Sequence, residues 1–465
     1  MKYAIIGAGL AGLTAAYELH QLDPQAEIDV FEADERIGGK LYTVPFESGR
    51  TDMGAEGFLA FRKDATDFFE TLGLKDAIVA PSGLKSLFYC GGNLHASPMG
   101  GAMGIPASSK GLEGLISEET AKRIDAEKDR PAIDWQPGKD ISVGKLVRER
   151  YGDDVVDHVV SSLLGGVYSS SADDLGIRAT IPQLAAVFDK MVAEGEKVTL
   201  AGAVEKLDAA RAKMREAAGD AKPKPVFGAF KDGYAQLYEE LAEQSGAQIH
   251  LDSFISGIKR GPGGFRLEKA EGVFDRVLVT TPAPTAAAQL RAVSPEASAA
   301  LKNVKLASSV VVGLKFDSAE GLPDNSGILV AADEPGVRAK AFTLASKKWP
   351  HLAERGGALV RASFGRFGDD SLVRADEDDL VDYALDDLQK ITGFDGRAAG
   401  LSEIFVQRWF GGLPCYNDTH LETVAAVRAA LESVPGIDVA GAWADGVGIP
   451  NVIAGARAAA GRLVK

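Results

Sequence analysis

The stretch Ala4-Ile5-Ile6-Gly7-Ala8-Gly9-Leu10-Ala11-Gly12-Leu13 joins a buried strand pattern to a glycine-rich turn and the start of an apolar helix. Gly7, Gly9 and Gly12 have the G-x-G-x-x-G spacing of a dinucleotide-binding strand–turn–helix unit. The first glycine permits the tight turn, the second lets a pyrophosphate approach the backbone, and the third lets the helix pack on the strand. We therefore expect a pyrophosphate at the free N–H groups of a helix that starts at Leu10 and Ala11.

An acidic residue follows at the distance that this unit requires. Glu32 lies twenty residues after Gly12, at the end of a predicted strand over residues 28–31. A carboxylate in this place accepts hydrogen bonds from ribose hydroxyls and disfavours a 2′-phosphate. The strand, the helix and the acid together distinguish this motif from a structural glycine turn.

The sequence then continues as an E-x-x-x-R-x-G-G-K pattern that ends with Arg36, Gly38, Gly39 and Lys40. Two consecutive glycines allow the backbone to approach a large cofactor closely. Arg36 can offset pyrophosphate charge or brace the loop. An NAD dehydrogenase does not need this extension, whereas flavoproteins of the amine-oxidase and porphyrinogen-oxidase class have it.

Bulk composition excludes several classes of protein. The chain has 465 residues, 46% of them hydrophobic, and a net charge of −15 without a long basic run, which argues against nucleic-acid binding. No stretch reaches the ~20 apolar residues that a membrane span needs. The first predicted strand starts at Lys2, which leaves no room for a signal peptide, and only Cys90 and Cys415 are present, so we expect a reducing cytoplasm. The six histidines lack ligand spacing, and no metal site is predicted.

The order of strand and helix patterns predicts an α/β fold of three parts. A Rossmann-like FAD-binding domain is assembled from the discontinuous segments 1–80, 226–285 and 436–465. An antiparallel-sheet substrate domain takes 81–95 and 286–435, and a helical insert takes 96–225. Within the insert, residues 155–164 are expected to form a helix, and 219–225 to form an exposed linker.

The end of the chain carries a second glycine-rich turn, Gly446-Val447-Gly448-Ile449-Pro450. Proline suits the first position of a helix because its missing N–H is not needed there. The positive end of this last helix can face the flavin ring where negative charge collects on reduction. A capped terminal helix without a ligand is the alternative.

Several further motifs give the chain a close resemblance to the FAD-dependent porphyrinogen oxidases, the family of coproporphyrinogen III oxidase and protoporphyrinogen oxidase. The resemblance spans nearly the whole chain and lies in the runs 54–59, 93–106, 163–168, 178–183, 347–351, 408–420 and 446–450. It implies an FAD domain, a substrate domain and a helical domain that can touch membrane. The charged stretch 116–129 allows peripheral membrane contact at most.

The resemblance also implies positions for the cofactor and the substrate. FAD contacts are implied for Glu32, Gly39, Lys40, Gly54, Ala55, Glu56, Gly57, Ile255, Trp409, Val447, Gly448 and Ile449. Arg62 and Lys63 lie where the family places a basic residue at the substrate pocket, and Val167 where it places an apolar residue over the macrocycle. The porphyrinogen substrates of this family carry propionate groups. Arg178, Lys347 and Lys348 are therefore further candidates for pairing with the substrate.

The resemblance implies the six-electron oxidation of coproporphyrinogen III to coproporphyrin III in haem biosynthesis, with oxygen as acceptor and peroxide as product. Protoporphyrinogen IX oxidation is the alternative, and a flavin amine oxidase is a more distant one. The flavin carries the redox chemistry, and no general base is assigned. Cys415 lies where monoamine oxidases bind flavin covalently, but a lone buried cysteine is usually inert, so we expect non-covalent FAD. A monomer is expected, which can hand its product to other haem-pathway enzymes.

Overall fold

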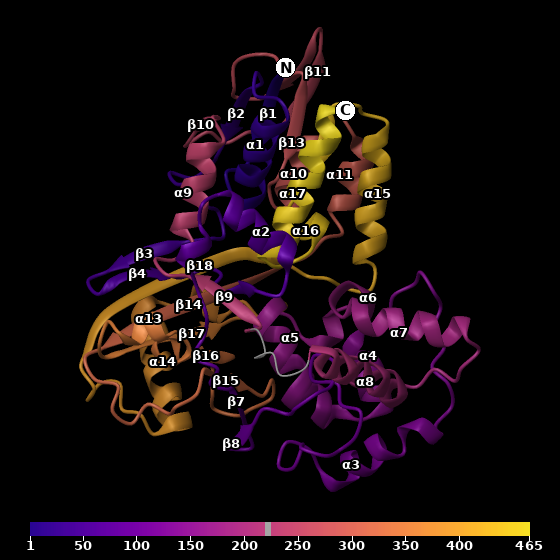
Figure 1. Cartoon of the computed structure of the whole chain (residues 1–465), viewed down its shortest axis with the longest axis vertical. Coiled ribbons are helices and arrows are strands. Elements are labelled where there is room, and N and C mark those ends of the chain that lie inside the picture. Colours follow the sequence, from indigo (N-terminus) through magenta and orange to yellow (C-terminus); the bar gives the residue numbers. More distant parts are fainter. Residues whose placement is uncertain (219–224) are drawn as a thin grey trace.

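The computed structural model describes residues 1–218 and 225–465. The predicted linker over 219–225 lies, apart from Pro225, outside the described residues. In the described part a parallel sheet with its helices forms one end of the molecule, and a large sheet and a group of helices lie side by side at the other end (Figure 1). The α/β fold class is therefore confirmed, while the exact domain boundaries stay a prediction.

The parallel sheet is assembled from separate segments of the chain, as predicted. Its strands follow the spatial order β10 (Gln248–His250), β2 (Glu27–Phe31), β1 (Lys2–Ile6), β13 (Arg276–Val279) and β19 (Ile437–Val439). All four pairings are parallel, and Tyr3 of β1 lies opposite Arg276 of β13 and Ile28 of β2. The carboxyl ends of these strands therefore meet at one edge of the sheet, where an open α/β sheet binds its ligands.

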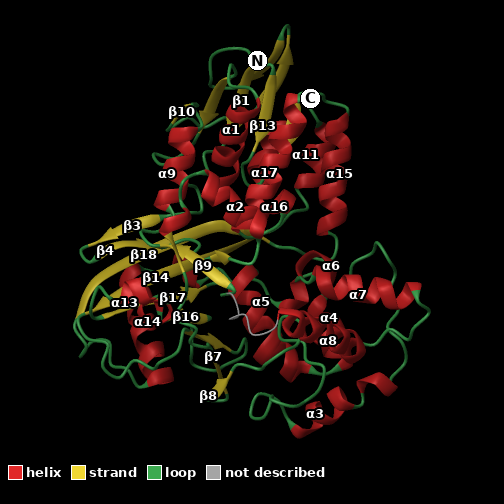
Figure 2. Cartoon of the chain, in the orientation of Figure 1, coloured by secondary structure: helices red, strands yellow, loops and turns green. Residues whose placement is uncertain are grey.

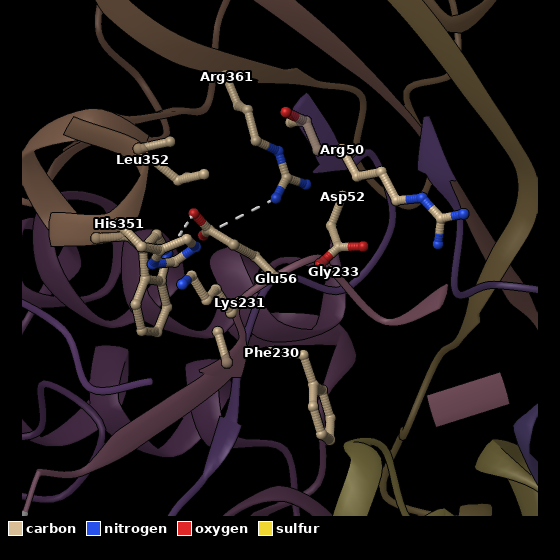
Figure 3. Close-up of a pocket in the computed structure, with 13 residues that line it drawn as sticks. Arg50, Asp52, Glu56, Phe230, Lys231, Gly233, His351, Leu352 and Arg361 are labelled. Carbon is tan, nitrogen blue, oxygen red and sulfur yellow. Dashed lines mark hydrogen bonds and ion pairs between the residues drawn. The ribbon is translucent and has the colours of Figure 1, made fainter. Parts of the chain in front are cut away.

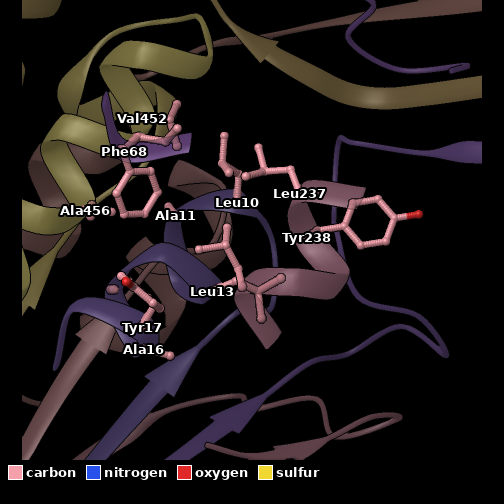
Figure 4. Packing of buried hydrophobic residues seen from close by; sticks show 14 of the residues in the cluster. Leu10, Ala11, Leu13, Ala16, Tyr17, Phe68, Leu237, Tyr238, Val452 and Ala456 are labelled. Carbon is pink, nitrogen blue, oxygen red and sulfur yellow. The ribbon is translucent and has the colours of Figure 1, made fainter. Parts of the chain in front are cut away.

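Helices cover both faces of this sheet because side chains alternate along each strand. Tyr3 and Ile5 pack on one face against the helices α1 (Leu10–Leu22), α9 (Ala235–Gln244) and α17 (Ile449–Val464). Ala4 and Ile6 pack on the other face against α10 (Ala283–Leu290), α11 (Pro295–Leu301) and α15 (His420–Glu432). Figure 4 shows the first of these clusters, in which α1 lies between α17 and α9. There, the rings of Tyr17 in α1 and Phe68 in α2 (Lys63–Thr71) pack edge to face, with their centroids 5.6 Å apart.

The large sheet has seven strands, in the order β18 (Leu401–Pro414), β14 (Leu306–Phe316), β17 (Ala358–Phe364), β16 (Ala341–Thr343), β15 (Gly327–Val330), β7 (Leu87–Cys90) and β8 (Asn93–Ala96). The helix α14 (Glu377–Thr392) packs on it. The predicted antiparallel arrangement needs one correction, because β15 and β7 run parallel. No hairpin joins these two strands, which lie far apart in the chain, so local turn geometry does not set their direction.

Among the described residues, three small sheets and several short helices complete the strand-rich parts. The small sheets pair β3 (Thr43–Phe46) with β4 (Gly49–Asp52), β11 (Ile258–Gly261) with β12 (Gly264–Leu267), and β9 (Phe227–Phe230) with both β5 (Phe58–Leu59) and β6 (Ile78–Val79). The short helices are α12 (Ala345–Lys348), α13 (Pro350–Ala353) and α16 (Ala442–Asp445).

The remaining helices gather beside the large sheet (Figure 2). They are α3 (Glu118–Asp125), α4 (Val143–Arg150), α5 (Ser161–Tyr168), α6 (Ile177–Thr180), α7 (Pro182–Ala193) and α8 (Leu200–Ala218). The helix predicted over 155–164 starts as a π-helix over Val155–Val160 and continues as α5. Its four valines are fully buried, and β-branched side chains lower helix propensity only slightly, so they do not by themselves account for the π-helix.

A buried ion pair links the end of α4 to the start of α8. Glu127, which is completely buried, accepts a hydrogen bond of 2.7 Å from Nε of Arg150 at the end of α4. The same carboxylate accepts bonds of 2.9 Å from the backbone N–H groups of Leu200 and Ala201 at the start of α8. It therefore neutralises a buried cation and caps a helix at once.

The substitution Glu127→Ala is expected to destabilise the helical region by about 3–5 kcal/mol, because it leaves the Arg150 charge buried without a partner. Urea unfolding followed by far-UV circular dichroism measures the effect as a lower midpoint of the first transition. Lys128→Ala is the matched control, because it breaks the neighbouring solvent-exposed pair with Glu205 and should leave the midpoint unchanged. Equal midpoints for the two variants would contradict this role of Glu127.

Candidate active site

The first glycine turn has the geometry that its spacing predicts. Gly7 has φ +108°, which favours glycine, and α1 begins directly after Gly9 at Leu10. A side chain on Gly12 would overlap the carbonyl oxygen of Gly7. The hydroxyl of Thr280, which follows β13, donates to the carbonyls of Ile6 (2.9 Å) and Gly7 (3.1 Å). The turn is thus held from both sides, with the N-terminus of α1 directed at the edge of the sheet.

Glu32 stands beside this turn. Its Oε2 accepts the backbone N–H of Ala8 at 2.7 Å, and its Oε1 accepts the N–H of Asp34 at 3.0 Å. These two bonds orient the carboxylate, and each oxygen retains a lone pair that can accept a hydrogen bond from a hydroxyl group. The predicted contact Ile255 lies close by, because the N–H of Ser253 donates to the Glu32 carbonyl at 2.6 Å.

The Arg36–Lys40 loop closes over the turn. Gly9 and Gly38 form a β-bridge, and Gly38 and Gly39 have φ values of +97° and +57°. The Arg36 guanidinium donates to the carbonyls of Ile37, Gly39 and Leu41. It also stacks on Tyr42, with its Cζ 4.0 Å from the centroid of the ring. Of the two roles considered for Arg36, the structure shows the bracing of this loop.

Lys40 contributes a positive charge without an acidic partner. Within residues 1–218 and 225–465, no carboxylate oxygen lies within 4.0 Å of its amine. Burial lowers the pKa of Lys40 to about 8. A partly buried amine of this kind is stabilised by a nearby anion, so this site suits a negatively charged ligand.

A second loop, Gly54–Gly57, is held by the large sheet. A side chain on Gly54 would overlap the Lys40 carbonyl. The carbonyl of Gly54 accepts a hydrogen bond of 2.8 Å from Arg361 of β17. Nε1 of Trp409, on β18, donates to the Met53 carbonyl at 3.0 Å. Two strands of the large sheet therefore position the loop against the nucleotide side of the molecule.

The carboxylate of Glu56 points away from the turn, into a small polar cavity. It accepts hydrogen bonds from Nζ of Lys348 (3.0 Å) and Nε1 of Trp349 (2.8 Å), and Arg361 lies 3.9 Å away. Figure 3 shows the Arg361 guanidinium directed at Glu56 across this cavity, with Asp52 on the other side. Burial alone would raise the pKa of Glu56, but Lys348 and Arg361 hold it below its ordinary value.

The other groups around this cavity have a structural role. Burial raises the pKa of Asp52 to about 6, and its carboxylate accepts the N–H of Tyr234 just before α9. Nε and Nη1 of Arg361 and Nδ1 of His351 are buried without a hydrogen-bond partner among the described residues. A cavity lined by unpaired polar atoms of this kind can hold an ordered water molecule. The 54–57 loop is held here by the hydrogen bonds of Lys348 and Trp349 to Glu56.

The C-terminal turn lies next to the first one. Gly446 and Gly448 have φ values of +117° and +107°, and α17 begins at Ile449 with Pro450 in its first turn. Because α1 and α17 both follow strands of the parallel sheet, both helices start at its carboxyl edge, side by side (Figure 1). Two positive helix ends therefore point at one region.

Two residues of the run 408–420 hold the segment that precedes this turn. The hydroxyl of Tyr416 donates to the carbonyl of Ala442. The ring of His420 lies 4.0 Å from that of Tyr416, and its Nε2 is 2.8 Å from the Trp443 carbonyl. Burial lowers the pKa of His420 to about 4, so this histidine is neutral and structural.

The residues predicted for the substrate fall into two groups. Arg62 lies at the site: it forms two hydrogen bonds with Asp64 and one of 2.6 Å with Asn451 in the first turn of α17. Lys63 next to it is exposed, and Val167, near the end of α5, is 43% exposed.

The other three predicted cations are already paired with acids. Arg178 forms two bonds of 2.8 Å with Asp189, and its guanidinium lies over the ring of Trp135. Lys347 pairs with Asp324 at 2.7 Å, and Lys348 pairs with Glu56. These ion pairs largely neutralise the three charges within the protein. The assignment of the three residues to the substrate stays a prediction.

Sequence reasoning missed Arg361 as a support of the site. It lies in the middle of the buried strand Ala358–Phe364, where a cation is unusual and needs a partner. A cation in a buried strand could have indicated that Arg361 has a special role. The sequence could not show that its partners are Gly54 and Glu56, some three hundred residues earlier.

Comparison with known proteins identifies the family. Residues 10–464 match the model for flavin containing amine oxidoreductases. The chain belongs to this family. It is 37% identical to a coproporphyrinogen III oxidase of Mycobacterium tuberculosis H37Rv over 100% of this chain and 96% of the relative. Its identity to the enzyme of the same name from Bacillus subtilis 168 is 30%, over 98% and 96% of the two chains.

Solved structures agree with this family. The structure of a candidate protoporphyrinogen oxidase from Exiguobacterium sp. 255-15 superposes with a TM-score of 0.84 at 29% identity, covering 99% of this chain and 98% of the other. Cyclohexylamine oxidase from Brevibacterium oxydans has a TM-score of 0.67 at 15% identity, covering 99% and 98%, and shares the fold. The predicted resemblance to the porphyrinogen oxidases is confirmed.

The residues at the sheet edge fit the flavin of such an oxidoreductase. The turn around Gly7 and Gly12 admits no side chain, the two helix ends and Lys40 are positive, and Glu32 is oriented as an acceptor. No helix among the described residues is long and apolar enough to cross a membrane.

The variant Gly12→Ala is expected to purify largely without flavin, because the added methyl group forces α1 away from the carbonyl of Gly7. The ratio of flavin absorbance to protein absorbance measures this loss. Gly461→Ala in α17 is the control, since nothing lies within 4 Å of the methyl group that it adds. A wild-type flavin ratio in Gly12→Ala would refute the role assigned to this turn.

Proposed function

We propose that this chain catalyses the FAD-dependent, six-electron oxidation of coproporphyrinogen III to coproporphyrin III in haem biosynthesis. Three molecules of oxygen accept the electrons in pairs and leave as three molecules of hydrogen peroxide. The observation that carries the proposal is the 37% identity, over the whole chain, to a coproporphyrinogen III oxidase. The flavin-type turn at the sheet edge supports it from the structure.

FAD is the flavin that we propose, and three features of the site support this choice over a mononucleotide. Glu32 is oriented to accept ribose hydroxyls, Lys40 and the N-terminus of α1 favour the pyrophosphate, and the start of α17 favours the ring system. When bound, the flavin supplies the two-electron acceptor for each step. Contacts with it are proposed for the backbone from Gly54 to Gly57 and for Ala55, Trp409, Val447 and Gly448.

We propose that the flavin is bound without a covalent link. Sγ of Cys415 is directed at the Asp174 carbonyl at 3.4 Å, and the residue is buried. Burial raises the pKa of its thiol to about 11, so the thiolate needed for bond formation is scarce at neutral pH.

The macrocycle is proposed to lie between the C-terminal turn and α5. Val167 offers an exposed apolar surface there, and Arg62 is fixed by Asp64 and Asn451 beside the start of α17. These residues bind and orient the substrate, and we assign no general base. Arg178, Lys347 and Lys348 add positive charge that their acidic partners reduce.

Protoporphyrinogen IX oxidation is the second candidate, favoured by the close structural match to a candidate protoporphyrinogen oxidase. The two substrates differ in charge, since coproporphyrinogen carries four propionates and protoporphyrinogen carries two. The cyclohexylamine oxidase structure, at 15% identity, supports a shared fold and not a shared substrate. We further propose a monomeric enzyme of the cytoplasm, with at most peripheral membrane contact.

Anaerobic mixing of the flavin-loaded protein with each porphyrinogen tests these alternatives. Coproporphyrinogen III is expected to bleach the flavin absorbance near 450 nm, on the order of tenfold faster than protoporphyrinogen IX, because it has more carboxylates to pair. Coproporphyrin fluorescence and peroxide should appear when air is admitted, and release of the cofactor by heat identifies FAD. The reverse preference would assign the second function, and no bleaching by either compound would exclude both.

A further inference from the structure

A substrate with four carboxylates needs cations that the protein itself has not neutralised. Three of the cations near the predicted pocket already pair with Asp189, Asp324 and Glu56. Arg62 is bound to Asp64 through two nitrogens. The question is therefore which cations of the described structure lack an acidic partner and lie close to Val167.

Two such cations lie together at the end of α5. Lys340, just before β16, is only 7% exposed, and its amine donates to Oγ of Ser169 at 2.6 Å and to the carbonyl of Gly365 at 2.7 Å. Arg366 is half-buried, and one of its guanidinium nitrogens reaches the Ala332 carbonyl at 3.3 Å. Among the described residues neither cation has a carboxylate within ion-pair distance.

The electrostatic state of these groups is unusual. Burial, with Arg366 as a second cause, lowers the pKa of Lys340 to about 7. Burial also lowers the pKa of Arg366, although Asp369 opposes this effect. Two like charges that destabilise each other in a poorly solvated place are stabilised by an incoming anion. Lys340 has one N–H that is not used by Ser169 or Gly365, and most of the Arg366 donors are unused in the described structure.

Their place in the fold connects them with the proposed macrocycle site. Ser169, which Lys340 contacts, comes two residues after Val167 and ends α5 with φ +50°. Its carbonyl accepts the N–H of Phe367 at 2.6 Å. On the other side, the ring of Tyr168 lies 5.8 Å from that of Tyr416, whose hydroxyl bonds the segment before the C-terminal turn. The end of α5 therefore spans the distance between the cation pair and the proposed flavin turn.

We propose that Lys340 and Arg366 form a carboxylate-binding site for propionate groups of the tetrapyrrole substrate. The proposal rests on the proposed function. Arg366, the more exposed of the two, can hold a carboxylate through two N–H groups, whereas Lys340 supplies a single charge from within. Lys340 and Arg366 are binding residues in this assignment and take no part in electron transfer.

A purely structural role is the rival explanation, because Lys340 also joins the end of α5 to the large sheet. The two explanations differ in what a change at Lys340 affects. Loss of a binding charge weakens the binding of only those ligands that carry carboxylates, whereas displacement of α5 weakens the binding of every porphyrin. A comparison of coproporphyrin III with its tetramethyl ester separates these effects, because the two ligands share the macrocycle and differ in charge.

The test uses the flavin-loaded full chain with the substitutions Lys340→Met and Arg366→Met, and measures the Kd of each ligand by porphyrin fluorescence. Each variant is expected to bind coproporphyrin III about 10- to 100-fold more weakly than the wild type, and the tetramethyl ester equally well. Lys340→Arg should recover part of the affinity for the acid.

Lys315→Met is the matched control. Lys315 lies on β14, is 8% exposed, and its amine also donates to a backbone carbonyl, that of Gly356. Burial likewise lowers its pKa, but it lies away from α5, so its loss should change neither Kd. Flavin content and the thermal midpoint confirm the folding of each variant, and Arg366→Met provides the measurement should Lys340→Met fold poorly.

The outcomes are distinct. Unchanged affinity for the acid in both variants, or an equal loss for acid and ester, overturns the proposed site while leaving the proposed function intact. A wild-type protein whose flavin no porphyrinogen reduces overturns the proposed function and this inference with it. Loss of acid binding alone, with ester binding retained, supports the site.

Discussion

The close approach of α1 to the end of β1 is the constraint on which the rest of the site depends. Gly12 lies so near the carbonyl of Gly7 that no side chain fits between them, and Thr280 ties the same turn to β13. Because the helix starts this close to the strand, its unpaired N–H groups face the edge where the parallel strands end. Glu32 and the loop from Arg36 to Lys40 are then arranged around that point.

The large sheet contributes by holding loops that begin in the nucleotide-binding part. Arg361 and Trp409 hold the segment around Gly54, and Glu56 connects it to Lys348 and Trp349. These bonds join residues that are about three hundred positions apart in the chain. A flavin site of this kind is therefore complete only when both sheets are folded and in contact.

Charge is used in two ways in this acidic protein. Most cations near the site stabilise the architecture, as Arg36 does through three backbone carbonyls and Lys348 through Glu56. A smaller set, which includes Lys40, Lys340 and Arg366, has no acidic partner in the described structure, and burial lowers the pKa of each of them. An anion bound beside these groups would favour their charged forms. Burial decides how strongly each of these charges favours an anion.

The sequence by itself determined the glycine turn, the acid that follows it, the last helix and the α/β class. These features depend on residues close together in the chain and on hydrophobic patterns with the period of a strand (two) or a helix (3.6), which can be recognised in a sequence. The tertiary structure alone decided the parallel pairing of β15 with β7, the π-helical start of the segment 155–168, and the partner of each cation. Lys340 and Lys347 lie seven residues apart on either side of β16, yet Lys347 pairs with Asp324 and Lys340 has no acidic partner among the described residues. The reason is that an ion pair depends on which distant segments the folded chain brings within a few ångströms, and no local pattern records that distance.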